Sequence, residues 1–296
     1  IINYQLSTLM LDINYQLSTL NFPSSPRGLY EPIEYALASG GKRLRPTLTF
    51  LAAEMFGGKD EDVLPAALAL EVFHNFTLLH DDVMDRADVR RGRPTVHVRW
   101  NDNTAILSGD QMMIEAYKLL AQLPDNKLPQ VLRWFNQMGT EICEGQQYDV
   151  DFESRNDVSM DEYMEMIRLK TSVLLANALQ TGAYLADAPQ DAIAHLYTYG
   201  IHLGLAFQIQ DDLLDVYGNP ATFGKAIGGD ILCGKKSFML LTALHDADTA
   251  TRNELNQWLT SVSCSPQEKI AAVTALYDRL GVRAKAEQAI ALHTSQ

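Results

Sequence analysis

Apolar residues recur at the spacing of an α-helix along almost the whole chain. The stretch 63–82 is rich in Ala and Leu and has no internal Gly, and 172–186 and 192–215 follow the same pattern. Short alternating runs of β-branched residues, which would predict strands, are nearly absent. Breaks rich in Gly and Pro, such as 40–46 and 217–230, divide the chain into roughly ten helices. Because no break is long or polar enough to be a linker, we predict one all-α domain over residues 1–296 with a wide apolar interior.

Composition narrows the classes of function. The formal net charge is −13, and Lys and Arg do not form long runs, which argues against nucleic acid as the main partner. The three cysteines lie far apart without a CxxC pair, so we expect a reduced, cytoplasmic protein without a disulfide framework. No uninterrupted apolar run approaches the ~18–20 residues of a membrane span, and no signal peptide is visible. We therefore expect no integral membrane segment.

The N-terminus contains a short duplication. The sequence "INYQLSTL" occurs at residues 2–9 and again at 13–20. This repeat is shorter than any solenoid unit. We expect residues 1–20 to be irregular or artefactual and infer no function from them.

Two acidic motifs of the form DDxxD end apolar helical stretches. Asp81 and Asp85 are four residues apart and share a helix face, whereas Asp82 points about 100° away. The same pattern recurs at Asp211, Asp212 and Asp215. Like charges at this spacing repel by ~0.2–0.5 kcal/mol, and a divalent cation reverses that repulsion. Mg²⁺ prefers oxygen ligands and bridges carboxylates to phosphates, so two such sites predict Mg²⁺ ions that hold a polyphosphate. The alternative is a pair of acidic helix ends without a ligand.

Basic residues lie close to both motifs. Arginine matches phosphate oxygens with a bidentate fork. His74 lies seven residues before Asp81, two turns along the same helix face. Each of these groups alone is more often a solvated cation or a structural histidine. As a set in an acidic protein they predict two anion pockets, built from Lys42, Arg43, Arg45, His74, Arg90, Arg91, Lys170, Lys225 and Lys235.

These elements together resemble a known family. The segments "GGKRLRP", "LLHDDVMDRADVRRGRPT", "GQQYD", "LKTS", "FQIQDDLLDVYG", "FGKAIGGD" and "GKKS" occur in the order found in trans-isoprenyl diphosphate synthases of the polyprenyl synthetase family, between residues 40 and about 240. The resemblance implies the all-α isoprenoid synthase fold, with ten or more helices around a deep central cavity, and a homodimer. It implies a prenyltransferase that joins an allylic diphosphate (dimethylallyl, geranyl or farnesyl) to isopentenyl diphosphate by Mg²⁺-dependent ionisation, condensation and elimination.

The resemblance also implies roles for individual positions. Three Mg²⁺ ions would be bound by Asp81, Asp85 and Asp211, supported by Asp82 and Asp215. The allylic diphosphate would be held by Arg90, Lys170 and Lys235, with Lys225 nearby, and isopentenyl diphosphate by Lys42, Arg45, His74 and Arg91. The developing carbocation would be flanked by Lys170, Thr171 and Gln208, with Gln146 and Asp230 in support. A released diphosphate oxygen is the expected base.

Product length depends on the residues before the first motif. In the resembling family a bulky residue five positions before the first aspartate acts as the floor of the cavity, and Phe76 holds that position here. Thr77 follows it, and no residues are inserted in DDVMD. We therefore expect a C20 product, with C15 close behind; the alternative is that Phe76 only packs in the core.

Two alternative functions remain open from the sequence. A class I terpene cyclase shares the helical fold and the first motif but usually carries a different second metal motif. A non-catalytic subunit of a heteromeric prenyl synthase typically loses one aspartate motif, whereas this chain keeps both.

Overall fold

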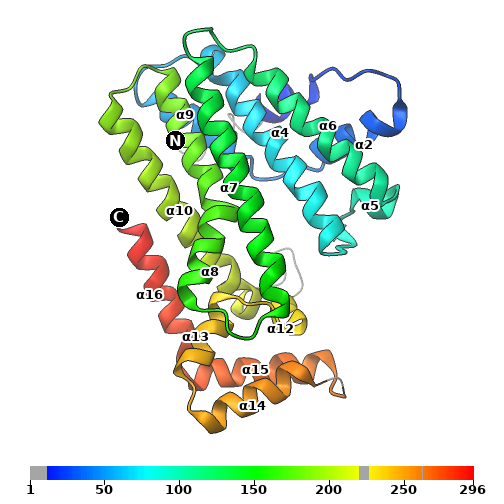
Figure 1. The fold of residues 1–296 in the computed structure, drawn as a ribbon, viewed down its shortest axis with the longest axis vertical. Coiled ribbons are helices and arrows are strands. Elements are labelled where there is room, and N and C mark those ends of the chain that lie inside the picture. The colour runs from blue at the N-terminus through cyan, green and yellow to red at the C-terminus, as the bar shows by residue number, and fades with distance from the viewer. Residues whose placement is uncertain (1–11, 220–226, 262) are drawn as a thin grey trace. The chain divides into compact units, whose positions relative to one another are not determined.

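The computed structural model describes residues 12–219, 227–261 and 263–296, and these are almost entirely helical (Figure 1). The all-α prediction is confirmed. The strands in the described part are β1 (Val89–Arg90) and β2 (Arg93–Pro94), which form one short antiparallel hairpin. Residues 12–18, which include most of the second copy of the duplicated sequence at 13–20, begin the described chain as a helical segment.

Contacts group the chain into two compact units. Unit 1 comprises Ile1–Asn136 and Ala176–Tyr197, and unit 2 comprises Gln137–Leu175 and Thr198–Gln296. The prediction of a single domain stays a prediction.

The helices of unit 1 are α2 (Arg27–Leu37), α3 (Leu44–Glu54), α4 (Asp60–Met84), α5 (Val96–Arg99) and α6 (Asp102–Leu120). Those of unit 2 are α8 (Met160–Ile167), the π-helical turn η1 (Arg168–Ser172), α12 (Gly229–Cys233), α13 (Phe238–Asp246), α14 (Thr249–Thr260), α15 (Pro266–Arg279) and α16 (Val282–Thr294). Three helices contribute residues to both units, namely α7 (Leu128–Ser154), α9 (Val173–Leu185) and α10 (Gln190–Tyr217).

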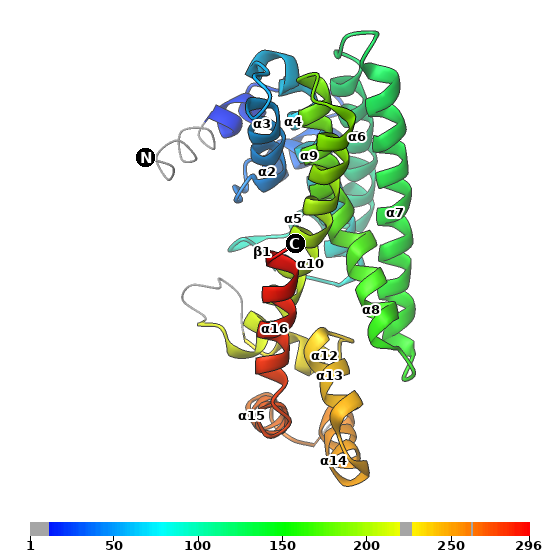
Figure 2. The ribbon, with the colours of Figure 1, turned by 90° about the vertical axis from the view of Figure 1, so that its left-hand side faces the viewer.

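Helix α4 forms the core of unit 1. Acidic residues 60–62 occupy its first turn, where they complement the helix dipole. Ala66, Ala67 and Ala69 are fully buried, and these small side chains let α3 and α6 pack closely against it (Figure 2). Of the described helices, α4 alone is long and apolar enough to cross a membrane. Its apolar window is 61% buried within the protein, which is typical of a core helix, and its last turns carry the first acidic motif.

Two helices of unit 2 begin at capping boxes. Ser159 and Glu162 form a capping box at α8, and Ser265 and Glu268 form another at α15. Helices α14 and α15 pack side by side (Figures 1 and 2). The apolar core of this unit includes the buried ring of Tyr163, which lies beside the second acidic motif.

Candidate active site

The first acidic motif lies where α4 ends. Asp85 is the C-cap residue, and its N–H donates to the carbonyl oxygen of Asp81, while the N–H of Arg86 donates to that of Val83. Asp82 is 4% exposed, whereas Asp81 is half-buried and Asp85 is exposed, as expected from the helical spacing. Burial, together with the Asp81 charge, raises the pKa of Asp82 against the opposing effect of Arg90. Asp81 and Asp85 are therefore the accessible carboxylates of this motif.

The β1–β2 hairpin brings Arg90 back onto the motif. Arg90 Nε donates to Asp82 Oδ1 at 2.7 Å, and its Nη2 lies 3.4 Å from Asp81 Oδ2. The turn between the strands contains Arg91 and Gly92, both with positive φ. The buried carboxylate of Asp82 thus orients Arg90 beside the two accessible aspartates.

Cationic groups surround His74 on the same helix. Burial first, and then the charges of Arg45, Arg91, Arg90 and Arg43, hold the pKa of His74 well below its usual value, so its imidazole is neutral. Burial also lowers the pKa of Arg45 to about 10, which leaves it charged at neutral pH. Arg45 Nε is buried and has no hydrogen-bond partner. A buried donor without a partner is costly, and an anion in contact with it would remove that cost.

The loop before α3 lies against Arg91. Arg91 Nη1 donates to the carbonyl oxygen of Gly40. Gly41 has φ +134°, a backbone conformation that favours glycine, and a Cβ there would lie 2.9 Å from the Arg91 guanidinium carbon. Lys42 is exposed on this loop. The structure thus brings together Arg45, His74 and Arg91, three of the four residues predicted for isopentenyl diphosphate, and the fourth, Lys42, follows Gly41 on the loop.

Arg43 does not belong to this accessible group. It is 3% exposed, and its guanidinium donates to Glu71 Oε1 at 2.6 Å, to the Leu37 carbonyl at 2.6 Å and to Asn14 Oδ1 at 2.8 Å. Glu71 is 1% exposed. Arg43 is therefore a structural residue that joins helices α2, α3 and α4, and the interpretation of this residue as part of an anion pocket is wrong.

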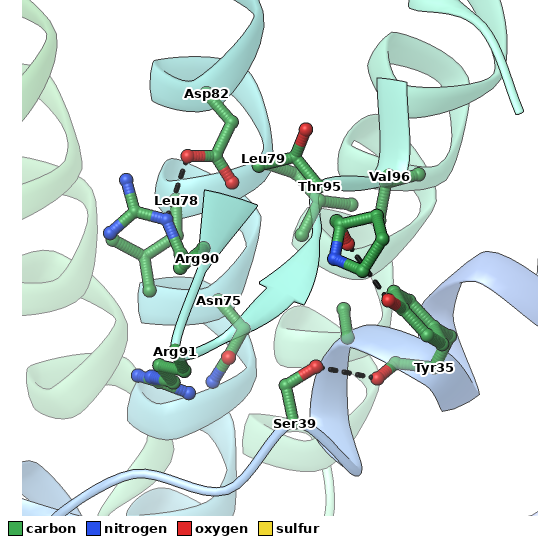
Figure 3. A pocket seen from close by; sticks show the side chains of 12 residues that line it. Tyr35, Ser39, Asn75, Leu78, Leu79, Asp82, Arg90, Arg91, Thr95 and Val96 are labelled. Carbon is green, nitrogen blue, oxygen red and sulfur yellow. Dashed lines mark hydrogen bonds and ion pairs between the residues drawn. The ribbon is translucent and has the colours of Figure 1, made fainter. Parts of the chain in front are cut away.

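A pocket opens beside the hairpin (Figure 3). Asn75, Asp82, Arg90 and Arg91 line it from α4 and the hairpin, and Tyr35 lines it from α2. The Tyr35 hydroxyl donates to the carbonyl oxygen at position 94 at 2.8 Å, which fixes the hairpin against α2. The pocket is therefore polar on the side that carries the first motif.

Phe76 lies in a chain of aromatic contacts below the first motif. Its ring meets His80 edge-on at 4.9 Å between centroids and Phe73 at 5.2 Å, and Phe73 meets Phe135 at 5.0 Å. Thr77 turns away from this chain, because its hydroxyl donates to the His74 carbonyl at 2.8 Å. Phe76 is half-buried and is held in place by these rings.

The second acidic motif lies near the end of α10 in unit 2. Asp211 is half-buried, and Asp215 is 8% exposed. The N–H of Asp230 donates to Asp215 Oδ2 at 3.1 Å, so the start of α12 is fixed to this motif. Asp211 is thus the more accessible carboxylate of the two.

Lys170 pairs with an aspartate on α7. Its Nζ donates to Asp149 Oδ2 at 2.6 Å. Burial raises the pKa of Asp149, but Lys235 and Lys170 together hold it below its usual range. Both lysines predicted to bind the allylic diphosphate therefore lie near this one carboxylate. Lys225, predicted beside them, lies outside the described residues.

A hydrogen-bond network fixes the orientation of the Gln208 amide. Thr171 Oγ1 donates to Gln208 Oε1 at 3.2 Å, and Gln208 Nε2 donates to Asp212 Oδ1 at 3.2 Å. Asp212 Oδ2 accepts from the Tyr163 hydroxyl at 2.6 Å and from the Phe238 N–H at 2.7 Å. Because a carboxylate only accepts, the nitrogen of Gln208 must face Asp212 and its carbonyl oxygen must face Thr171. Burial and the charge of Asp230 raise the pKa of Asp212 to about 6.

The donor sets of both motifs fit Mg²⁺ that is bound together with a diphosphate. No group of three or more His, Cys, Asp or Glu side chains in the described ranges surrounds a single point. Each motif offers carboxylate oxygens at a helix end. Mg²⁺ usually binds through one or two carboxylates and completes its shell with waters and phosphate oxygens, so a closed protein cage is not required.

Sequence reasoning missed four residues of these networks. Asp149 ends the segment "GQQYD", in which the resemblance assigns a supporting role only to Gln146. Glu71 is a lone acidic residue in an otherwise apolar run, which was a usable signal for a buried ion pair. Asp212 belongs to the second acidic motif, but the motif alone does not indicate its contact with Gln208. No feature of the sequence indicates the contact of Tyr163 with Asp212.

Comparisons with known proteins agree on one family. The sequence model of the Polyprenyl synthetase family matches residues 26–277. A geranylgeranyl diphosphate synthase of Methanosarcina mazei is 44% identical over 221 residues, which cover 74% of this chain and 68% of that protein. A short chain isoprenyl diphosphate synthase of Methanocaldococcus jannaschii is 40% identical, covering 84% of this chain and 76% of its own length. A crystal structure of a geranylgeranyl pyrophosphate synthase superposes with a TM-score of 0.92 at 45% identity, covering 99% of this chain and 89% of that chain.

Proposed function

Because this chain belongs to the polyprenyl synthetase family, has the isoprenoid synthase fold and is a short-chain trans-prenyl diphosphate synthase, we propose how its residues carry out the transfer. The reaction joins an allylic diphosphate to isopentenyl diphosphate. Its difficult step is cleavage of the allylic C–O bond, which leaves negative charge on the departing diphosphate and positive charge on carbon.

The allylic diphosphate is bound by cations and by carboxylates that hold Mg²⁺. Asp81, Asp85 and Asp211 hold the ions, for which we propose three sites, and Asp82 and Asp215 support them. When bound, Mg²⁺ stabilises negative charge on the leaving oxygen. Arg90, Lys170 and Lys235, with Lys225 nearby, bind the diphosphate oxygens directly. The ion pairs of Arg90 with Asp82 and of Lys170 with Asp149 support this assignment, because they hold both cations before the substrate arrives.

Isopentenyl diphosphate is bound by the residues around His74. The observation that carries this assignment is the buried Nε of Arg45, which has no hydrogen-bond partner, next to a neutral imidazole. Arg91 and Lys42 add further donors from the hairpin and the loop. A second diphosphate site is required by a synthase but not by a terpene cyclase, so this cluster favours the synthase.

The carbocation is stabilised by oxygens that do not attack it. The hydrogen bond to Asp212 turns the carbonyl oxygen of Gln208 toward Thr171 and away from the buried carboxylate. Gln208 and Thr171 thus direct negative dipoles to the developing positive charge. The double bond of isopentenyl diphosphate then attacks, and a diphosphate oxygen removes the final proton, so no protein nucleophile is needed.

We propose that the product is C20 geranylgeranyl diphosphate, with C15 as the alternative. Phe76 acts as the floor for the growing chain, and its edge-on contacts with Phe73 and His80 support a rigid wall. Thr77 leaves no second bulky side chain at the next position.

We also propose a cytoplasmic homodimer. Ile106, Leu107 and Ile114 on one side of α6 are 41%, 59% and 48% exposed, and these apolar side chains are a suitable contact surface for a second copy. Size-exclusion chromatography with light scattering tests this state. A monomeric wild type would contradict it.

The assay that tests the function supplies radiolabelled allylic diphosphate with Mg²⁺, with and without isopentenyl diphosphate. We expect a longer prenyl diphosphate only when isopentenyl diphosphate is present. Formation of a cyclic hydrocarbon without it would favour the cyclase, and inactivity that only a second polypeptide relieves would favour the non-catalytic subunit.

A further inference from the structure

The segment that carries Lys170 and Thr171 is not an α-helix. Residues Arg168–Ser172 form a π-helical turn, in which the N–H of Val173 donates to the carbonyl oxygen of Arg168. Such a turn contains one residue more than an α-helical turn and persists only where its surroundings favour it. Helices α7 and α10 contact this turn within unit 2, and in each helix the residue at the contact is a glycine.

Gly145 of α7 and Gly204 of α10 lie directly against its backbone. A Cβ at position 145 would lie 2.4 Å from the backbone nitrogen of Lys170 and 2.8 Å from Leu169 Cβ. A Cβ at position 204 would lie 2.4 Å from Ser172 Cα and 2.6 Å from Ser172 Cβ. Cβ contacts below 3.0 Å essentially do not occur, so no residue other than glycine permits this approach.

Each glycine lies one helical turn before the partner of a reactive side chain. Gly145 precedes Asp149 by four residues, and Gly204 precedes Gln208 by four, so each pair shares one helix face. Asp149 accepts from Lys170 at 2.6 Å, and Gln208 accepts from Thr171 at 3.2 Å. The close contact at each glycine therefore sets the distance between the π-helical turn and the neighbouring helix. The side-chain hydrogen bond one turn later must span that distance.

We propose that Gly145 and Gly204 are positioning residues for prenyl transfer. They hold the π-helical turn between α7 and α10, so that Lys170 and Thr171 are fixed at Asp149 and Gln208. The proposal rests on the roles assigned above to Lys170, Thr171 and Gln208. An added methyl group would push the turn away by about 1 Å before the shortest contact reached the ordinary 3.4 Å. A displacement of this size at a reacting centre lowers the rate by about 100-fold.

The test compares Gly145→Ala and Gly204→Ala with wild type and with the control Gly28→Ala. Gly28 is an exposed residue of α2, and a Cβ there would meet nothing within 4 Å. With enzyme in excess, Mg²⁺ present and isopentenyl diphosphate saturating, a single turnover reports the chemical step. We expect both variants to be about 100-fold slower than the control. Their KM for isopentenyl diphosphate should not change, because its proposed ligands lie on other elements, and circular dichroism should show folded protein.

A second-site variant separates positioning from general damage. Gly204→Ala combined with Ser172→Gly removes Ser172 Cβ and Oγ, two of the three atoms that the new methyl group meets. The nearest atom, Ser172 Cα at 2.4 Å, remains, so the double variant should still be slower than Ser172→Gly alone. This comparison also applies if neither single variant folds.

The proposal is overturned if folded Gly145→Ala and Gly204→Ala match the control, or if the double variant equals Ser172→Gly. Its failure is distinct from failure of the proposed function. In the latter case wild type itself would show no Mg²⁺-dependent transfer, and no rate would exist to compare.

Discussion

Asp212→Asn should lower activity without lowering stability, because the charge of Asp212 is unfavourable to the fold but orients Gln208. The asparagine has one oxygen, and the Tyr163 hydroxyl and the Phe238 N–H already donate to that side of residue 212. Its amide nitrogen would then face Gln208 Nε2, and two donors would oppose each other. Gln208 must flip, and its carbonyl oxygen turns away from Thr171.

The size of the effect follows from the lost interaction. A hydrogen bond to a charged group contributes about 1.5–3 kcal/mol, which corresponds to about a 10- to 100-fold lower rate if the cation loses the carbonyl dipole. The effect of Asp212→Asn on stability is opposite, because the substitution removes a buried charge. The pKa of Asp212 is raised to about 6. At roughly 1.36 kcal/mol per unit above the usual ~3.9, its ionised form destabilises the folded state by roughly 3 kcal/mol at pH 7.

The sign of the pH dependence is fixed by the same shift. Between about pH 4 and pH 6 the folded state holds a proton on Asp212 that the unfolded state has lost, so wild type loses stability as the pH rises through this range. The asparagine variant does not lose stability in this pH range through residue 212, because its side chain does not ionise. Its free energy of unfolding at pH 7 should equal or exceed that of wild type, and any advantage should vanish near pH 4.

Single-turnover kinetics and urea unfolding at both pH values measure the two effects. Tyr163→Phe is the matched control, because it removes the other side-chain donor to Asp212 and leaves the Gln208 contact intact. It should lose about 1–3 kcal/mol of stability and keep its rate. A wild-type rate in Asp212→Asn, or a loss of several kcal/mol at pH 7, would refute the reasoning.

Four further predictions follow from the site. Phe76→Ala should lengthen the product seen by mass spectrometry, whereas Phe22→Ala, at another half-buried aromatic, should not; an unchanged product would place the floor elsewhere. Arg45→Gln should raise the KM for isopentenyl diphosphate by about 10- to 100-fold with little change for the allylic substrate, and an equal rise for both would contradict the assignment. Removal of divalent cations with EDTA should abolish turnover and Mg²⁺ should restore it, so activity in EDTA would exclude the metal. The lowered pKa of His74 means that the unfolded state binds its proton first, so stability should fall as the pH drops below about 6.5. His74→Gln should reduce that slope in urea titrations, and an identical slope would show that His74 is not its source.

The sequence predicted the helical elements and the faces of the first motif because both follow from local periodicity. Helix α4 spans Asp60–Met84, and Asp82 turns inward while Asp81 and Asp85 stay accessible. Arg45 and Arg91 of unit 1 both lie near His74, since the loop and the hairpin that precede or carry them flank the same helix.

The features that the sequence did not predict share a physical cause. The π-helical turn at "RLKTS" depends on how closely α7 and α10 approach it, and no local propensity encodes that approach. The burial of Arg43 depends on Glu71, Asn14 and Leu37, which come from separate segments. Local spacing cannot distinguish such an anchored arginine from Arg45, whose Nε has no hydrogen-bond partner.

The buried ion pair of Arg43 with Glu71 has a consequence for inhibitor chemistry. Each nitrogen of the Arg43 guanidinium has a hydrogen-bond partner inside the protein, so an anionic diphosphate mimic would gain no contact from it. The segment contains three cationic residues, but only Lys42 and Arg45 could contact such a mimic. Replacing Arg43 would leave the Glu71 carboxylate buried without its cation, so the substitution should destabilise the protein rather than remove a phosphate contact.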